Sequence, residues 1–231
     1  MSFLSKSKPI MLSAVLTAAA SVPAAALDMT EKASIKIGDG EGYAEMIRYH
    51  APSQSLFVTA SETGTLERIS MANPSALGLA TPFDLDGGNV TAVAVHGDLV
   101  AASIKADAAD APGEVKLYDT NGTLLASYPT GALPDNVAFS PDGRYMLTAN
   151  EGEPSDDYSV DPEGSFTLID LANGPASAVV TQISLDGFSA PAGSRIVKPG
   201  SSFAADAEPE YVAFAPDGKL AYVTLQENNA V

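Results

Sequence analysis

Carboxylate side chains are concentrated in three short segments of this chain, and their crowding indicates a site for a hard cation. The densest segment is residues 150–163, and further acidic residues occur in segments 206–210 and 226–229. Crowded carboxylates repel one another unless a cation neutralises them, and Ca²⁺ is usually bound by about six to eight oxygen atoms. The candidate calcium ligands are Glu151, Glu153, Asp156, Asp157, Asp161, Glu163, Glu208, Glu210 and Glu227.

The same residues have a second explanation, which is a solvated acidic loop shaped by Pro154 and Pro162. Asp156, Asp157 and Asp161 lack the alternate-position spacing and the central glycine of the helix-flanked calcium-binding loop. Zinc is disfavoured, because the chain has no cysteine and only two histidines. A calcium-binding site and a surface that only increases solubility therefore remain two open explanations of these carboxylates.

Other catalytic chemistry has little support in the residue pattern. His50 and His96 each follow a predicted strand and are best interpreted as turn residues. The chain has no Gly-x-Ser-x-Gly motif that would supply a hydrolase nucleophile. Arg195 and Lys198 could meet an anionic substrate, although a surface role is favoured.

A repeated phrase predicts the elements that position these side chains. VAFSPDG occupies residues 137–143 and VAFAPDG occupies residues 212–218, and each follows a proline–acidic pair at residues 134–135 and 209–210. An apolar strand, a Pro-Asp-Gly turn and a second apolar strand are typical of the inner hairpin of a β-propeller blade.

The spacing of the repeats predicts the number of blades. The inner strands end at Tyr49, Val95, Phe139 and Phe214, which are 46, 44 and 75 residues apart. Blades recur every ~40–50 residues, so the third interval is one blade plus an insertion of about 30 residues. We expect an all-β fold, a β-propeller with about four blades, the last of them incomplete. An antiparallel sandwich is the alternative, but sandwiches seldom repeat a four-strand phrase in series.

The predicted strands follow from this alignment. Second strands are expected at 56–60, 99–103, 145–149 and 220–224, third strands at 64–70, 114–119 and 165–170, and fourth strands at 80–85, 124–130 and 178–185. The last repeat stops after its second strand, so we expect residues 27–231 to be the N-terminal part of a longer propeller domain.

Propeller topology predicts that the acidic segments meet. In each blade the link after the second strand lies on the same rim as the entrance to the first strand, so that rim collects Asp135 and the three acidic segments. Glu62, Glu151 and Glu227 directly follow the second strand in three of the repeats, whereas Ile104 and Lys105 stand at this step of the other repeat. We therefore expect carboxylates from several blades around one opening.

The N-terminal residues predict export. Lys6 and Lys8 precede an apolar stretch over residues 10–22, and residues 24–26 form a small-residue cleavage site. Cleavage of a signal peptide of residues 1–26 would deliver the protein to the periplasm, the extracellular space or the cell surface. No later segment is apolar enough to span a membrane.

The charge of the chain restricts its partners. The formal net charge is −17, and it becomes −19 once Lys6 and Lys8 are removed with the signal peptide. Nucleic acids and anionic lipids would be repelled. Without cysteine, stability outside the cytoplasm must come from packing or from bound ions.

Four stretches of the sequence resemble the choice-of-anchor I proteins. They are LPDNVAFSPDG at residues 133–143, ANEGEPSDDYSVDPEGS at 149–165, DAEPEYV at 206–212 and TLQENNA at 224–230, and the resemblance extends over about residues 33–231. The family comprises bacterial exported propellers with varied C-terminal surface attachment, and its animal relatives are labelled mesenchyme-specific cell-surface glycoproteins. The resemblance implies a complete ring of about seven blades, and some members are labelled alkaline phosphatase.

Two functions follow as expectations. The first is an exported propeller that binds a ligand or a cell-surface partner through a Ca²⁺-supported acidic rim. The alternative is a calcium-dependent phosphoesterase of the alkaline phosphatase kind that uses the same carboxylates.

Overall fold

The computed structural model describes residues 30–39, 43–86, 88–155 and 157–231. The chain divides into two units, Met1–Glu31 and Lys32–Val231, and all of the regular structure described below belongs to the second. The predicted signal peptide of residues 1–26 lies outside the described residues, as does the candidate ligand Asp156.

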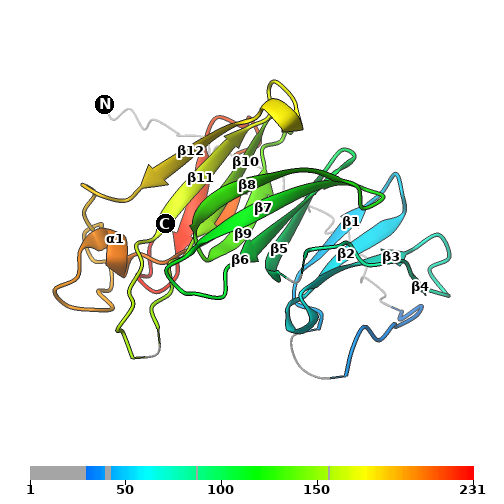
Figure 1. Cartoon of the computed structure of the whole chain (residues 1–231), viewed down its shortest axis with the longest axis horizontal. Helices are drawn as coiled ribbons and strands as arrows, with labels where there is room; N and C mark the ends of the chain where they lie inside the picture. The colour runs from blue at the N-terminus through cyan, green and yellow to red at the C-terminus, as the bar shows by residue number, and fades with distance from the viewer. Residues whose placement is uncertain (1–29, 40–42, 87, 156) are drawn as a thin grey trace, which may run out of the picture. The chain divides into compact units, whose positions relative to one another are not determined.

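The second unit consists of four antiparallel sheets that follow one another along the chain (Figure 1). The first sheet contains β1 (Ile47–His50), β2 (Ser55–Ala60), β3 (Thr65–Ser70) and β4 (Gly78–Leu79). The second contains β5 (Asn89–His96), β6 (Leu99–Lys105), β7 (Pro112–Asp119) and β8 (Leu124–Ala132). The third contains β9 (Pro134–Phe139), β10 (Tyr145–Asn150), β11 (Ser165–Asp170) and β12 (Val179–Ser184). The fourth contains only β13 (Pro209–Phe214) and β14 (Ala221–Leu225).

The repeated phrase forms the hairpins that its sequence predicts. In the β9–β10 turn, the Asp142 carboxylate accepts hydrogen bonds from the Ser140 hydroxyl (2.6 Å) and from the Arg144 backbone N–H (3.1 Å). Gly143 has a φ of +71° and Gly218, in the matching turn, a φ of +68°, which glycine adopts without steric cost. The Pro-Asp-Gly turns thus fix both hairpins.

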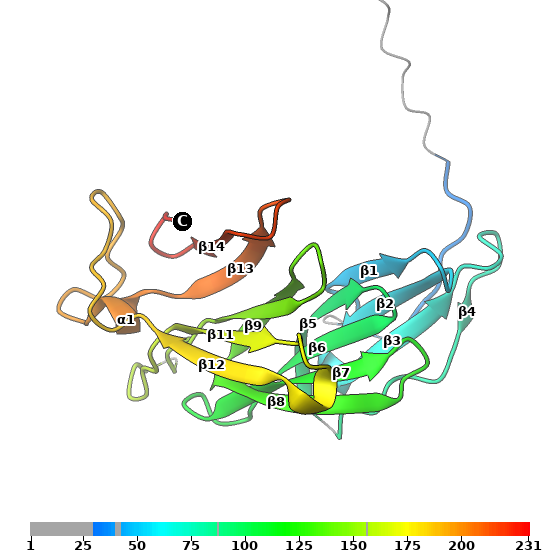
Figure 2. The same ribbon diagram turned by 90° about the horizontal axis from the view of Figure 1, so that it is seen from above.

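The sheets pack face to face through apolar side chains on alternate strand positions. One core cluster joins Phe57 and Leu66 of the first sheet to Val93 and Val100 of the second. Similar clusters join the second sheet to the third and the third to the fourth. The innermost strands β1, β5, β9 and β13 are neighbours in this order (Figure 2). Face-to-face sheets with adjacent inner strands are the packing expected of propeller blades, so the predicted fold is confirmed for these four repeats.

The fourth strand of the first repeat differs from the prediction. Strand β4 ends at Leu79, and the segment predicted at residues 80–85 contributes a single bridge between Phe83 and Leu66. Pro82 has no backbone N–H to donate to β3, which explains the interrupted pairing. All other predicted strands are present within a few residues.

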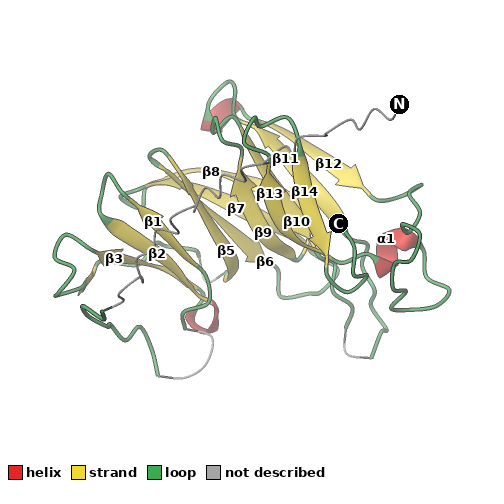
Figure 3. Cartoon of the chain, turned by 180° about the vertical axis from the view of Figure 1, so that it is seen from behind, coloured by secondary structure: helices red, strands yellow, loops and turns green. Residues whose placement is uncertain are grey.

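Regular helix is scarce among the described residues, in agreement with the predicted all-β fold (Figure 3). It comprises the 3₁₀ turns η1 (Ser61–Thr63) and η2 (Pro175–Ser177) and the single-turn helix α1 (Phe203–Asp206). Helix α1 lies in the predicted insertion between β12 and β13. No helix within the described ranges has the length and apolar composition needed to cross a bilayer.

The insertion is anchored by the buried carboxylate of Asp206. This side chain accepts hydrogen bonds from the backbone N–H groups of Val197 (2.9 Å) and Lys198 (2.7 Å) and from the Asn228 amide (2.8 Å). These contacts tie the loop before α1 to the turn after β14. Asp206 therefore supports the rim instead of contributing a free carboxylate to it.

Candidate functional site

A β-bulge recurs near the start of three innermost strands. In the third sheet the pairing skips Asp135, and in the fourth sheet it skips Glu210. The second sheet skips Thr91 at the same step. Because a bulge leaves its extra residue unpaired and redirects the side chain, these three residues occupy one structural position in successive sheets, and in two of them that position is acidic.

Glu151 is held close to the bulge of the third sheet. Its backbone N–H donates a 2.8 Å hydrogen bond to the carbonyl of Leu133, two residues before Asp135. Burial raises the pKa of Glu151 to about 8, and repulsion from four neighbouring carboxylates adds to this effect. In decreasing order of their effect, these carboxylates belong to Asp135, Glu153, Glu210 and Glu208.

Glu208 joins the same group from the end of the insertion. Its side chain is only 8% exposed. Burial raises its pKa to about 7, with added repulsion from the carboxylates of Glu227, Glu153, Glu210 and Asp161. Burial is also the main cause of the raised pKa values of Asp135 and Glu210. We call Asp135, Glu151, Glu153, Glu208 and Glu210 the acidic cluster.

The acidic cluster lacks local compensation. Within the described part of the chain, none of its five carboxylates forms an ion pair or accepts a hydrogen bond. Lys105 of β6 lowers the pKa of Asp135, but burial and the neighbouring acids outweigh it. Partly buried carboxylates that outnumber the nearby positive charges favour the binding of a cation or a proton.

A cavity of about 440 Å³ borders the acidic cluster. Glu45 and Glu62 line it from the first repeat, Lys105 lines it from the second, and Asp135, Glu151 and Glu153 line it from the third. The prediction that Glu62 and Glu151 share one opening is therefore confirmed. Glu227 belongs to the same neighbourhood, because its charge raises the pKa of both Glu208 and Glu210.

Two of the candidate calcium ligands are instead neutralised by the insertion. The Lys198 ammonium lies 2.5 Å from the Asp161 carboxylate, and the Arg195 guanidinium lies 2.9 Å from that of Glu227. Arg195 also donates to the backbone carbonyl of Glu227 (3.2 Å). Arg195 and Lys198 thus bind acids of the rim, a structural role that the spacing in the sequence did not reveal.

The remaining candidate calcium ligands are not part of the acidic cluster. Asp157 is a turn residue, since its carboxylate accepts hydrogen bonds from the Ser155 hydroxyl (2.9 Å) and the Ser159 backbone N–H (3.0 Å). These hydrogen bonds lower the pKa of Asp157 to about 2. Glu163 is exposed to solvent. The acidic cluster consequently retains Glu151, Glu153, Glu208 and Glu210 from the predicted set and adds Asp135.

No three Asp, Glu or His side chains within the described ranges converge at metal-binding distance in this conformation. His50 is the last residue of β1 instead of a turn residue, and its Nδ1 lies 2.7 Å from the hydroxyl of Ser53 in the following turn. His96 stacks near Phe139, with 5.8 Å between ring centroids, at the opposite end of the strands from Lys105. The predicted calcium site remains a prediction.

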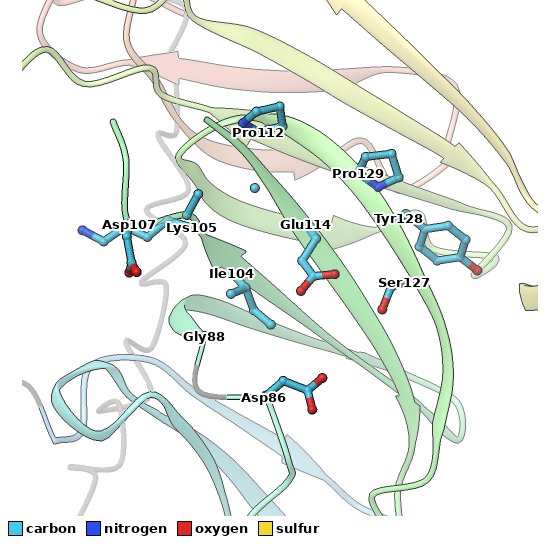
Figure 4. A pocket seen from close by; sticks show the side chains of 12 residues that line it. Asp86, Gly88, Ile104, Lys105, Asp107, Pro112, Glu114, Ser127, Tyr128 and Pro129 are labelled. Carbon is cyan, nitrogen blue, oxygen red and sulfur yellow. The ribbon is translucent and has the colours of Figure 1, made fainter. Parts of the chain in front are cut away.

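A second and larger cavity, of about 580 Å³, lies on the second sheet (Figure 4). Asp86 and Glu114 line it, but both are neutralised by the buried Lys116, whose ammonium lies 2.6 Å and 3.6 Å from their carboxylates. Lys116 also donates to the Leu85 carbonyl (3.0 Å). These contacts fasten the link between the first two sheets to β7, so the carboxylates here have a structural role.

Comparisons with known proteins agree with this architecture. The model of the choice-of-anchor I domain matches residues 45–231. Among solved structures, Kuenenia stuttgartiensis hydrazine synthase is similar at a TM-score of 0.56 and 15% identity, covering 78% of this chain and 49% of that one. The Swd1 β-propeller domain of Myceliophteria thermophila is similar at a TM-score of 0.53 and 12% identity, covering 80% and 50%.

A protein from Lactobacillus plantarum is similar at a TM-score of 0.55 and 16% identity, covering 78% of this chain and 50% of its own. At these identities the likeness shows the fold alone. The chain spans about half the length of the solved structures that it matches. No curated protein matches its sequence.

Proposed function

The chain belongs to the choice-of-anchor I family, and from that premise we propose that it is an exported β-propeller protein that binds its ligand or cell-surface partner through a Ca²⁺-supported acidic cluster. The observation that carries the proposal is the gathering of five carboxylates from two adjacent sheets, none of which forms an ion pair with a described residue and which have only Lys105 as a nearby positive charge. A bound cation would relieve their mutual repulsion and would give a ligand with oxygen donors a point of attachment.

The donor chemistry of the acidic cluster fits a hard cation. Every donor is a carboxylate oxygen, and histidine and cysteine are absent from the cluster. Asp135, Glu151 and Glu210 would hold the cation, since Asp135 and Glu210 occupy equivalent bulges and Glu151 interacts with both. Because these side chains repel one another, we expect them to close around the cation only when it binds.

Calcium titration by calorimetry tests the proposal, combined with melting temperatures in Ca²⁺ and in chelator. We expect the protein to bind Ca²⁺ and to melt at a higher temperature when it is bound, and Glu151→Gln to weaken binding at least tenfold. Asp98→Asn is the matched control, because it removes the same charge from an exposed side chain in the β5–β6 turn, at the opposite end of those strands. A protein that takes up no Ca²⁺ and melts identically in chelator would overturn the proposal.

An activity assay on the same protein samples tests the phosphoesterase alternative. Turnover of p-nitrophenyl phosphate that needs Ca²⁺ and disappears in Glu151→Gln would establish it. Calcium binding without turnover would leave a binding protein.

A further inference from the structure

A second candidate site faces the innermost strands of all four sheets. A pocket of about 260 Å³ is bordered by Arg48 of β1, His96 of β5, Asn136 and Phe139 of β9, and Tyr211 of β13, among other residues. We call it the inner-strand pocket. It lies outside the acidic cluster and shares no lining residue with the cavity of about 440 Å³.

The charge of the inner-strand pocket is opposite to that of the chain. No Asp or Glu lines it, whereas Arg48 adds a positive charge. Arg48 forms no ion pair with any described residue, and among these residues its guanidinium donates one hydrogen bond, from Nη1 to the Ile47 carbonyl (2.9 Å). A guanidinium has five N–H donors in a fixed plane, so most of those of Arg48 remain available to a ligand.

Asn136 provides a second donor without a partner. The side chain is 1% exposed, and its Oδ1 accepts a 3.2 Å hydrogen bond from the backbone N–H of Val212. Because an N–H can only donate to the oxygen, this bond fixes the orientation of the amide. Nδ2 is then left without an acceptor among the described residues. Buried donors are rarely left unpaired, so a ligand or a water molecule in the pocket would supply the acceptor.

The other residues that line the pocket are mostly apolar or aromatic, although Ser140 adds a hydroxyl. Phe139, Phe214 and Tyr211 supply rings, and Val95 and Val137 supply aliphatic surface. A guanidinium together with three aromatic rings suits a ligand with an anionic head and a flat apolar body. The volume is slightly below the ~300–1,000 Å³ of pockets for drug-sized molecules, so the ligand is small.

We propose that the inner-strand pocket binds a small aromatic carboxylate, with Arg48 pairing with the carboxylate and the rings packing against the aromatic body. Arginine and a carboxylate form two parallel N–H···O hydrogen bonds, which select this head group over an uncharged amide. The proposal is independent of the acidic cluster, because neither Ca²⁺ nor any of the five carboxylates takes part.

The test is ligand-observed NMR with phenylacetate and with its uncharged counterpart phenylacetamide, using the full chain. We expect phenylacetate to bind and phenylacetamide to bind at least tenfold more weakly. Arg48→Gln should reduce phenylacetate binding at least tenfold, and Arg48→Lys should restore only part of it. Lys219→Gln is the control, because it removes an equal charge from an exposed turn outside the pocket.

A second variant keeps the test decisive if Arg48→Gln does not fold. Asn136→Asp keeps the oxygen that accepts from Val212 and adds a negative charge beside the pocket. It should weaken phenylacetate binding while leaving phenylacetamide unchanged. Equal binding of the two probes, no binding of phenylacetate, or binding unaffected by the Arg48 and Asn136 variants would each overturn the proposal.

Discussion

Asp135 and Glu210 are structurally equivalent, since each is the extra residue of a β-bulge near the start of an innermost strand. Both carboxylates raise the pKa of Glu151 by charge repulsion. Two blades thus contribute acids to one place by repeating one local irregularity. Thr91 marks the same bulge in the second sheet, and there the Oγ1 donates to the Pro134 carbonyl (2.5 Å).

The protonation of Glu151 makes stability dependent on pH. Its pKa is about 8 in the folded chain against an ordinary value of 4.5, so between these values the folded state binds more protons than the unfolded state. The free energy of unfolding should therefore fall as pH rises through this range in chelator. Glu208, with a pKa of about 7, adds to the same trend.

Glu151→Gln should flatten this decline and raise the melting temperature at pH values near 8. Burial and the neighbouring carboxylates of Asp135, Glu153, Glu210 and Glu208 together raise the pKa of Glu151, and the uncharged glutamine would not respond to them. Melting curves measured from acidic to alkaline pH would check it. A wild-type melting temperature that rises with pH across this range would contradict it.

Lys105 should oppose cation binding at the acidic cluster. It lines the same cavity as Asp135, Glu151 and Glu153 and lowers the pKa of Asp135. Lys105→Gln removes this positive charge, so Ca²⁺ affinity should increase roughly two- to fivefold at low ionic strength and less in high salt. Calorimetric titration at two salt concentrations measures the change, and reduced affinity in the variant would count against the proposed site.

The sequence predicted the hairpins well because their determinants are local. The Pro-Asp-Gly turns need only a few consecutive residues, and the strand alternation is visible within each repeat. The rim prediction is confirmed for Glu62 and Glu151, which line one cavity, whereas Glu227 is not among the residues that line it. The repeated proline–acidic pair was the signal that could have added Asp135 to the candidate ligands.

The rest of the site depends on contacts between distant segments. Lys198 pairs with Asp161, and Arg195 pairs with Glu227, at separations of 37 and 32 residues. No local pattern indicates which acids of the rim will be neutralised in this way. The inner-strand pocket combines four strands from separate repeats, and its charge is evident only once they are side by side.

Asp206→Asn should destabilise the fold through the insertion. The carboxylate accepts from two backbone N–H groups and from the Asn228 amide, and an asparagine would set one NH₂ group against another. Losing one such buried hydrogen bond costs about 1–3 kcal/mol of the free energy of unfolding. Urea denaturation measures this loss, with the exposed Asp110→Asn as the control. Equal stability of the two variants would show that the anchor is dispensable.

Gly164 allows the segment after the acidic loop to approach the insertion closely. A Cβ at this position would lie 2.1 Å from the carbonyl oxygen of Ala207, whereas a Cβ at Gly78 would meet nothing within 4 Å. The Gly164 N–H also donates to the Ala204 carbonyl (2.8 Å), which holds the loop against α1. Gly164→Ala must push these segments apart and should lower the free energy of unfolding by about 1–3 kcal/mol, as overpacking usually does.

Because the displaced segment carries Glu208, the Gly164→Ala variant should also weaken Ca²⁺ binding, while Gly78→Ala should change neither stability nor Ca²⁺ affinity. Denaturation and calcium titration of the two variants side by side would decide the matter, and a stable Gly164→Ala protein with unchanged affinity would refute this account of the contact.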